Sequence, residues 1–138
     1  MEDASELRAV RDELVRGARV TSRWLAAGSS TPATALAHEA GAAARLAAIA
    51  RQDMEDIDAC DVFAIFNPES ARSTGRGGRH VETGYALALG KRVIIVGVRG
   101  NVFHWLPEIT AVTDWSDFIA LFHNNATGEG RAVSLPSV

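Results

Sequence analysis

The stretch "DVFAIFNPESARSTGRGGRHVETGYALALGKRVIIVG" (residues 61–97) decides the fold, because two apolar runs flank a helix-like segment in it. Its first run, residues 61–66, and its last, residues 92–97, are continuous in the manner of strands that are buried on both faces. Residues 67–78 are rich in turn formers, and a helix is predicted over residues 79–89, closed by Gly90. A strand, a helix and a second strand in this order predict two parallel strands of one sheet.

The sequence on either side of this unit continues the alternation of helices and strands. Predicted elements are a helix over residues 4–17, a strand over 20–25, a helix over 34–58, and a short strand followed by a helix over 110–123. The second helix is rich in alanine, which is the best helix former. We therefore expect an α/β fold with a parallel sheet flanked by helices, as one domain over residues 1–123, with a flexible tail over residues 124–138.

Composition limits the classes of function. The 138 residues suit one domain, and 47% apolar with 22% charged residues is ordinary for a soluble globular protein. A net charge of −3 argues against nucleic acid as a partner. The single cysteine, Cys60, excludes an internal disulfide and fits a cytoplasmic protein, and the histidines lack metal-ligand spacing, so no metal is expected. The sequence has no apolar run of 18 residues, so no membrane partner is expected.

Glu82 is placed where the glycine-rich loop becomes a helix, and we expect it in the first helical turn. The positive end of the helix dipole stabilises a carboxylate there. An ionised carboxylate at the mouth of a pocket can attack an electrophilic sugar carbon and form a covalent intermediate. Glutamate is also common in first turns for purely structural reasons. The pattern alone leaves both interpretations open.

Residues 77–97 resemble the nucleoside 2-deoxyribosyltransferase family. That family has a glutamate, a variable residue and Gly-Tyr-Ala at the start of a helix, followed by a Gly-Lys turn and an apolar strand. The matching residues here are Glu82, Gly84, Tyr85, Ala86, Gly90 and Lys91. The strand headed by Asp61 and the segment "NVFHWLPEI" (residues 101–109) are similar to segments of the bacterial and phage branch. The resemblance covers about residues 18–118, most of the chain.

The resemblance implies a flavodoxin-like sheet and chemistry at an N-glycosidic bond. Glu82 would attack the anomeric carbon of a (deoxy)nucleoside or a nucleoside 5′-monophosphate, and a second base or water would then take the sugar from Glu82. Asp61 would protonate or position the base, and Tyr85 would lie near the sugar or support Glu82. The resemblance implies no cofactor. It implies a homo-oligomer, a dimer or larger, whose subunits complete each other's sites, with residues 101–107 facing the partner.

The loop before Glu82 departs from the family pattern. Transferases of the family have an aspartate six residues before the nucleophile, and this chain has Arg76 there, with Arg72 and Arg79 nearby. Three arginines suggest a bound anion such as a 5′-phosphate, and hence hydrolysis of a nucleotide; a solvated loop is the alternative. The expected substrate-binding residues are Gly77, Gly78, Arg76, Arg79, His80, Asn101 and His104.

A second departure is that the family begins with a central strand, whereas this chain begins inside the helix that follows that strand. The start site is set too late, or the chain is a shortened variant, or another element fills the place. Without that strand, a non-catalytic nucleotide-binding or sensor module on the same fold is the alternative function. The cytokinin-activating phosphoribohydrolases also have a glycine-rich loop and a glutamate at a helix start, but their Pro-Gly-Gly-x-Gly-Thr run is absent here.

Overall fold

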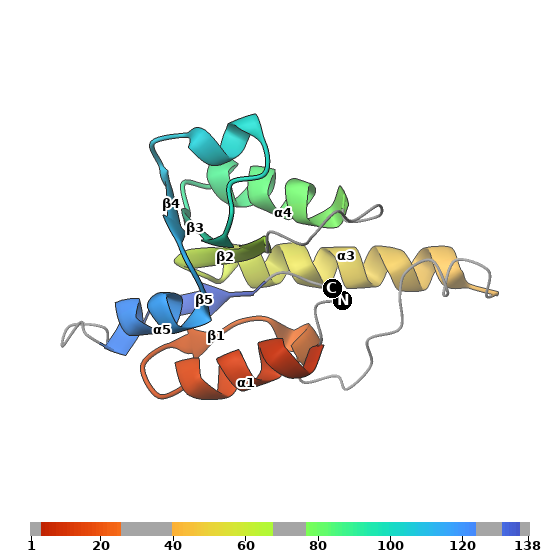
Figure 1. Cartoon of the computed structure of the whole chain (residues 1–138). Helices are drawn as coiled ribbons and strands as arrows, with labels where there is room; N and C mark the ends of the chain where they lie inside the picture. Colours follow the sequence, from red (N-terminus) through yellow and green to blue (C-terminus); the bar gives the residue numbers. More distant parts are fainter. Residues whose placement is uncertain (1–3, 26–39, 68–76, 124–130, 136–138) are drawn as a thin grey trace.

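Five parallel strands form one sheet in the order β1-β5-β2-β3-β4, with helices on both faces (Figure 1). The computed structural model describes residues 4–25, 40–67, 77–123 and 131–135. In chain order the elements are α1 (Ala4–Leu14), β1 (Arg19–Val20), the 3₁₀ helix η1 (Arg23–Leu25), α3 (Ala42–Asp58), β2 (Val62–Asn67), α4 (Gly77–Ala88), β3 (Arg92–Gly97), the 3₁₀ helix η2 (Val102–Trp105), β4 (Ile109–Val112), α5 (Trp115–His123) and β5 (Ala132–Ser134). This is a flavodoxin-like α/β arrangement, so the predicted fold class is confirmed.

The strands β2 and β3 are the apolar runs from which the sheet was predicted. They pair in parallel from Val62↔Arg92 to Asn67↔Gly97. Because successive side chains of a strand point to opposite faces, Phe63 and Ile65 enter one core and Val62 and Ala64 enter the other. Burial on both faces explains why these runs are continuously apolar.

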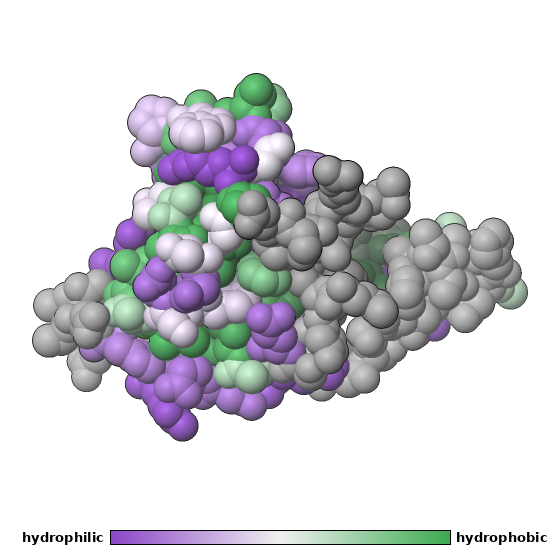
Figure 2. Space-filling model, viewed as in Figure 1, coloured by the Kyte–Doolittle hydropathy of each residue, from purple (hydrophilic) through white to green (hydrophobic). Residues whose placement is uncertain are grey.

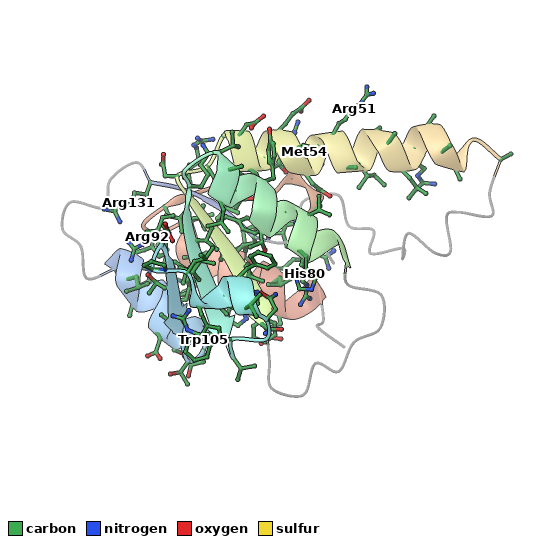
Figure 3. All side chains as sticks on the ribbon, turned by 90° about the horizontal axis from the view of Figure 1, so that it is seen from above. Arg51, Met54, His80, Arg92, Trp105 and Arg131 are labelled. Atoms are coloured by element: carbon green, nitrogen blue, oxygen red, sulfur yellow. The ribbon has the colours of Figure 1, made fainter. Side chains whose placement is uncertain are left out.

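Two helix layers cover the sheet. On one face α1 and α5 contribute Leu7, Leu14 and Phe118 to a core with Ala64 of β2. On the other face α3 and α4 contribute the buried residues Ile57 and Ala86. The first half of α3 extends beyond the sheet, and Arg51 projects from this helix into open space (Figure 3). Among the residues that the structure describes, no helix is both long and apolar enough to cross a membrane.

The strand β5 lies inside the sheet, next to the edge strand β1, and it is formed by a segment for which the sequence predicts a flexible tail. It pairs with β1 on one side, Val20↔Val133, and with β2 on the other, Val62↔Val133. The prediction is therefore wrong for residues 132–134, while 124–130 and 136–138 lie outside the described residues. Three residues are too few for a recognisable strand pattern, so this segment takes its conformation from its two neighbours.

The family resemblance implies an N-terminal strand inside the sheet, and β5 occupies such an interior place. Within the described part of the chain no strand precedes β1, and β5 fills the position between β1 and β2. The carboxyl end of β5 therefore lies at the edge of the sheet where ligands of doubly wound folds bind.

The predicted strand over residues 20–25 is shorter in the structure. β1 ends at Val20, and Arg23–Leu25 form the 3₁₀ helix η1. β1 ends early because side chains bond to the backbone here and compete with strand pairing. The Ser22 hydroxyl bonds to Leu135 O, and the Asp56 carboxylate accepts a bond from Arg23 N. The helix predicted over residues 34–58 is present from Ala42 onward, and residues 34–39 lie outside the described part.

Candidate functional site

The start of α4 is tied to the carboxyl end of β2. The Arg79 guanidinium is buried and donates a hydrogen bond to Phe66 O at 2.7 Å. Thr83 Oγ1 donates to Arg79 O at 2.6 Å, which fixes the next turn. Gly77 and Gly78 are exposed, and an added Cβ on either would meet nothing within 4 Å. The structure thus brings one predicted arginine to the sheet edge, while Arg72 and Arg76 lie outside the described residues.

Glu82 lies one turn after Arg79 and is buried, with 8% of its surface exposed. Because α4 begins at Gly77, Glu82 is in the second turn, so the prediction that it lies in the first turn is wrong. The helix continues through the glycine pair that was expected to belong to the loop. Burial lowers the pKa of Arg79, and the negative charge of Glu82 raises it again. Arg79 and Glu82 are therefore opposite charges that influence each other in a poorly solvated position.

Three predicted binding residues meet beside α4. Asn101 Oδ1 caps η2 by accepting bonds from Phe103 N at 2.9 Å and His104 N at 3.2 Å. Asn101 Nδ2 lies 3.0 Å from His104 Nε2 and 3.5 Å from His80 Nδ1, and His80 extends from the start of α4 (Figure 3). Burial, reinforced by the charges of His80 and Arg99, lowers the pKa of His104. His80, Asn101 and His104 therefore form one polar cluster between α4 and η2.

Asp61 lies at the other edge of the sheet, and the Tyr85 side chain, from the second half of α4, is directed away from the start of this helix. Asp61 precedes β2, and its Oδ2 accepts a bond from Ala132 N at 2.9 Å. The Tyr85 hydroxyl donates to Asp58 Oδ1 at 2.8 Å, at the end of α3, and this bond is the main reason that the pKa of Tyr85 is raised. The six residues of β2 span about 20 Å between this edge and the start of α4. The structure does not bring Asp61 to the Arg79–Glu82 pair.

A cavity of about 570 Å³, which the sequence analysis missed, opens at the carboxyl ends of β3 and β4. Its lining residues are Glu6, Phe66, Gly97, Val98, Ala111, Val112, Thr113, Asp114 and Trp115. The rings of Phe66 and Trp115 are stacked, with centroids 5.3 Å apart. Ligands of parallel sheets bind at the carboxyl ends of strands, so the polar pair Thr113 and Asp114, directly after a predicted strand, was the signal that could have revealed it.

Phe66 connects the cavity with α4, because its ring lines the cavity and its carbonyl oxygen accepts the bond from Arg79. Within the described residues, no three His, Cys, Asp or Glu side chains are grouped so that they could hold a metal ion.

Comparison with known proteins yields no relative, since no protein-family model, no curated protein and no solved structure matches the chain. The function must therefore be inferred from the residues at this edge of the sheet.

Proposed function

We propose that the protein cleaves the N-glycosidic bond of a (deoxy)nucleoside or a nucleoside 5′-monophosphate, with Glu82 as the nucleophile. The observation that carries this proposal is the buried Arg79–Glu82 pair at the start of α4, which is bonded to the carboxyl end of β2; a cavity opens at the same end of the sheet, on the face covered by α1 and α5. A volume of about 570 Å³ lies within the range of sites for small organic ligands. The resemblance of residues 77–97 to the deoxyribosyltransferases supports the same assignment.

The reaction takes place in two displacements. A Glu82 oxygen attacks the anomeric carbon, the carbon–nitrogen bond breaks, and the base leaves with the bonding electrons and takes up a proton from solvent or from His80. A second base or water then attacks the same carbon and regenerates the Glu82 carboxylate. Arg79 and Glu82 attract each other, and the ionised carboxylate is the nucleophilic form. Asp61 has no part in these steps, because it lies at the opposite edge of the sheet.

The surface over η2 supports assembly into a homo-oligomer. Val102 and Trp105 are 77% and 70% exposed, and Phe103 and Val81 are also largely exposed. Figure 2 shows apolar atoms on the surface over η2, at the top of the view. Exposed apolar groups that gather in one place commonly mark an interface between proteins. A second copy that covers η2 would also enclose the cluster of His80, Asn101 and His104.

One observation favours a second candidate, a nucleotide-binding module without catalysis. The Tyr85 hydroxyl is bonded to Asp58, and the Asp61 carboxylate is bonded to the backbone N–H of Ala132. Neither side chain therefore supports Glu82. A protein of this kind would bind the same ligands at the cavity and release no base.

The test is an assay of base release from deoxynucleosides, ribonucleosides and their 5′-monophosphates, each with and without a second free base. Release only with the second base identifies a transferase, and release without it identifies a hydrolase. Glu82→Gln should abolish release without loss of helical circular dichroism, whereas the control Glu108→Gln, at an exposed position, should be fully active. Full activity of Glu82→Gln would refute the proposed role of Glu82. Binding without release by the wild type would establish the second candidate.

A further inference from the structure

We propose that the cavity beside Phe66 and Trp115 holds the nucleobase of the substrate, and that it selects a base with an exocyclic amino group. The inference rests on the proposed function, because it names the part of the nucleoside that this cavity receives. The candidates are adenine, guanine and cytosine. The phosphate of a nucleotide is assigned to a place outside this cavity.

The walls of the cavity suit a flat aromatic ring. Phe66 and Trp115 stack with an angle of 30° between their planes, and Ala111 and Val112 add small apolar side chains. Phe118 contacts Trp115 edge to face at 5.4 Å, which fixes the indole from behind. Because the rings of Phe66 and Trp115 stack on each other and Trp115 is 8% exposed, a bound base would contact ring edges and the small apolar side chains, and this contact does not depend on which base is bound. The walls therefore account for binding a base, and the polar groups must provide selectivity.

The charges in the cavity favour hydrogen-bond donors and disfavour anions. Glu6 and Asp114 both line the cavity, and its described lining includes no lysine or arginine. Ionised carboxylates only accept hydrogen bonds, and they repel a phosphate. Asp114 Oδ1 accepts a bond from Asp117 N at 3.0 Å, so the carboxylate also caps α5 and is held in a fixed orientation. An exocyclic amino group offers two N–H donors to a cavity that presents two carboxylates.

Trp115 adds an independent indication that a ligand binds here. The side chain is 8% exposed, and its buried Nε1 has no hydrogen-bond partner in the described structure. A buried N–H group without an acceptor costs about 1–3 kcal/mol, so such groups are normally satisfied. N1 of adenine, N3 of cytosine and N3 of guanine are ring-nitrogen acceptors next to the amino group. A base that donates to Asp114 can therefore also accept from Trp115 after a small movement of the indole.

The position of Phe66 relates this base site to the nucleophile. The ring of Phe66 is part of the cavity wall, while its carbonyl oxygen is bonded to Arg79, one turn before Glu82. A base on the cavity side of β2 would place its sugar near the carboxyl end of this strand. α4 begins at the same end of β2 but covers the other face of the sheet, so the sugar would reach the Arg79–Glu82 pair around the carboxyl end of β2.

Calorimetric titration of the full-length protein with free bases tests the assignment. Adenine and cytosine should bind more tightly than hypoxanthine and uracil, which lack the amino group, and inorganic phosphate should not compete with them. Asp114→Asn keeps a side chain that caps helices well but removes the charge, and it should weaken binding of adenine about tenfold. Trp115→Phe keeps an aromatic wall but removes the N–H, and it should weaken binding several-fold. The matched control is Asp117→Asn, which removes the same charge from α5 at a position that does not line the cavity and should bind as the wild type does.

The outcomes separate this inference from the proposed function. If adenine binds in a manner that depends on Asp114 and Trp115 while no nucleoside is cleaved, the proposed reaction is wrong and the base site stands. If bases are released but both variants bind them normally with unchanged KM, the base site is wrong and the reaction stands. Absence of binding of any free base at millimolar concentration, or competition by phosphate, would also overturn the base site. Thermal unfolding of both variants checks that a loss of binding does not reflect a loss of folding.

Discussion

Ser22 closes the end of β5 through both backbone groups of Leu135. Leu135 N donates to Ser22 Oγ at 2.6 Å, and Ser22 Oγ donates to Leu135 O at 3.0 Å. Both residues are buried, so water does not compete for these groups. Thr21, the preceding residue, donates from Oγ1 to Asp56 O at 2.8 Å. Residues that follow β1 therefore fasten β5 to the sheet edge and to α3.

Ser22→Ala should lower the free energy of unfolding by about 1–3 kcal/mol, because it leaves a buried N–H and a buried carbonyl of Leu135 without the hydroxyl. The measurement is urea denaturation followed by circular dichroism. Ser134→Ala is the matched control, since Ser134 Oγ makes only a 3.3 Å contact with Ser22 Oγ, and it should cost less. Equal effects of the two changes would contradict the assigned role of Ser22.

Gly100→Ala should destabilise the carboxyl end of β3. A Cβ at this position would lie 2.7 Å from Asn67 Nδ2, which donates to Val98 O at 2.6 Å. The amide at the end of this side chain must move and give up this exposed bond, at a cost of about 0.5–1.5 kcal/mol in the free energy of unfolding. Gly84→Ala is the control, and it should change the free energy of unfolding in the opposite direction. Gly84 lies inside α4 with open space around it, so alanine there should stabilise by about 0.5–1 kcal/mol. If denaturant titration shows that both alanine variants are more stable than the wild type, the close approach of Gly100 to Asn67 is contradicted.

His104 should make stability fall as the pH is lowered through the range just below about 6.5, the ordinary pKa of histidine. Nδ1 of the ring accepts a bond from Gly100 N, which a second ring proton would break, and burial with the charges of His80 and Arg99 lowers the pKa. The unfolded chain then takes up a proton at a higher pH than the folded chain. The contribution of neutral His104 is therefore complete above the unfolded pKa and is lost as pH falls toward the folded pKa.

Urea midpoints of the wild type and of His104→Gln between pH 5 and 8 measure this contribution, and the variant should show a flatter dependence in the range below about 6.5. Titration of the His104 ring by NMR gives the folded pKa directly. A ring midpoint above the ordinary value would contradict the expected direction.

Cys60 should resist thiol reagents in the native state. Burial is the main cause that raises the pKa of its thiol, to about 11. The thiolate is the reactive form, so at pH 8 the native protein should react with Ellman's reagent far more slowly than a free thiol, and should react fully after unfolding in guanidinium. Cys60→Ser provides the blank. Native reaction at the rate of free cysteine would show that Cys60 is accessible.

The parts of the fold that the sequence predicted correctly are those in which local pattern and environment agree. The apolar runs of β2 and β3 and the alanine-rich α3 are such elements. Gly90 follows α4 with a φ of 68°, the left-handed conformation expected for a glycine after a helix. β5 could not be predicted, because its strand conformation depends on β1 and β2, which are distant in sequence.

The candidate site was predictable only where residues lie close together in sequence. Arg79 and Glu82 were identified from the glycine-rich loop, and Asn101 and His104 from one short segment. The bond from Arg79 to Phe66 O crosses a loop, and the cavity combines residues of α1, β2, β4 and α5, so neither leaves a local pattern. The resemblance implied a place for Asp61 in the site, but a residue that precedes a strand lies at the amino edge of a parallel sheet.

The interior place of β5 sets the order in which a newly synthesised chain can fold. Among the described strands β1 pairs only with β5, and the Ser22–Leu135 bonds join residues 113 positions apart. β2, α4, β3 and β4 pair with near neighbours in sequence and can assemble while the chain is still being translated. The α1–β1 segment is made first but cannot join the sheet until β5 has left the ribosome. During that interval the apolar faces of α1 and β2 are exposed, and surfaces of this kind make a partly folded chain prone to aggregate.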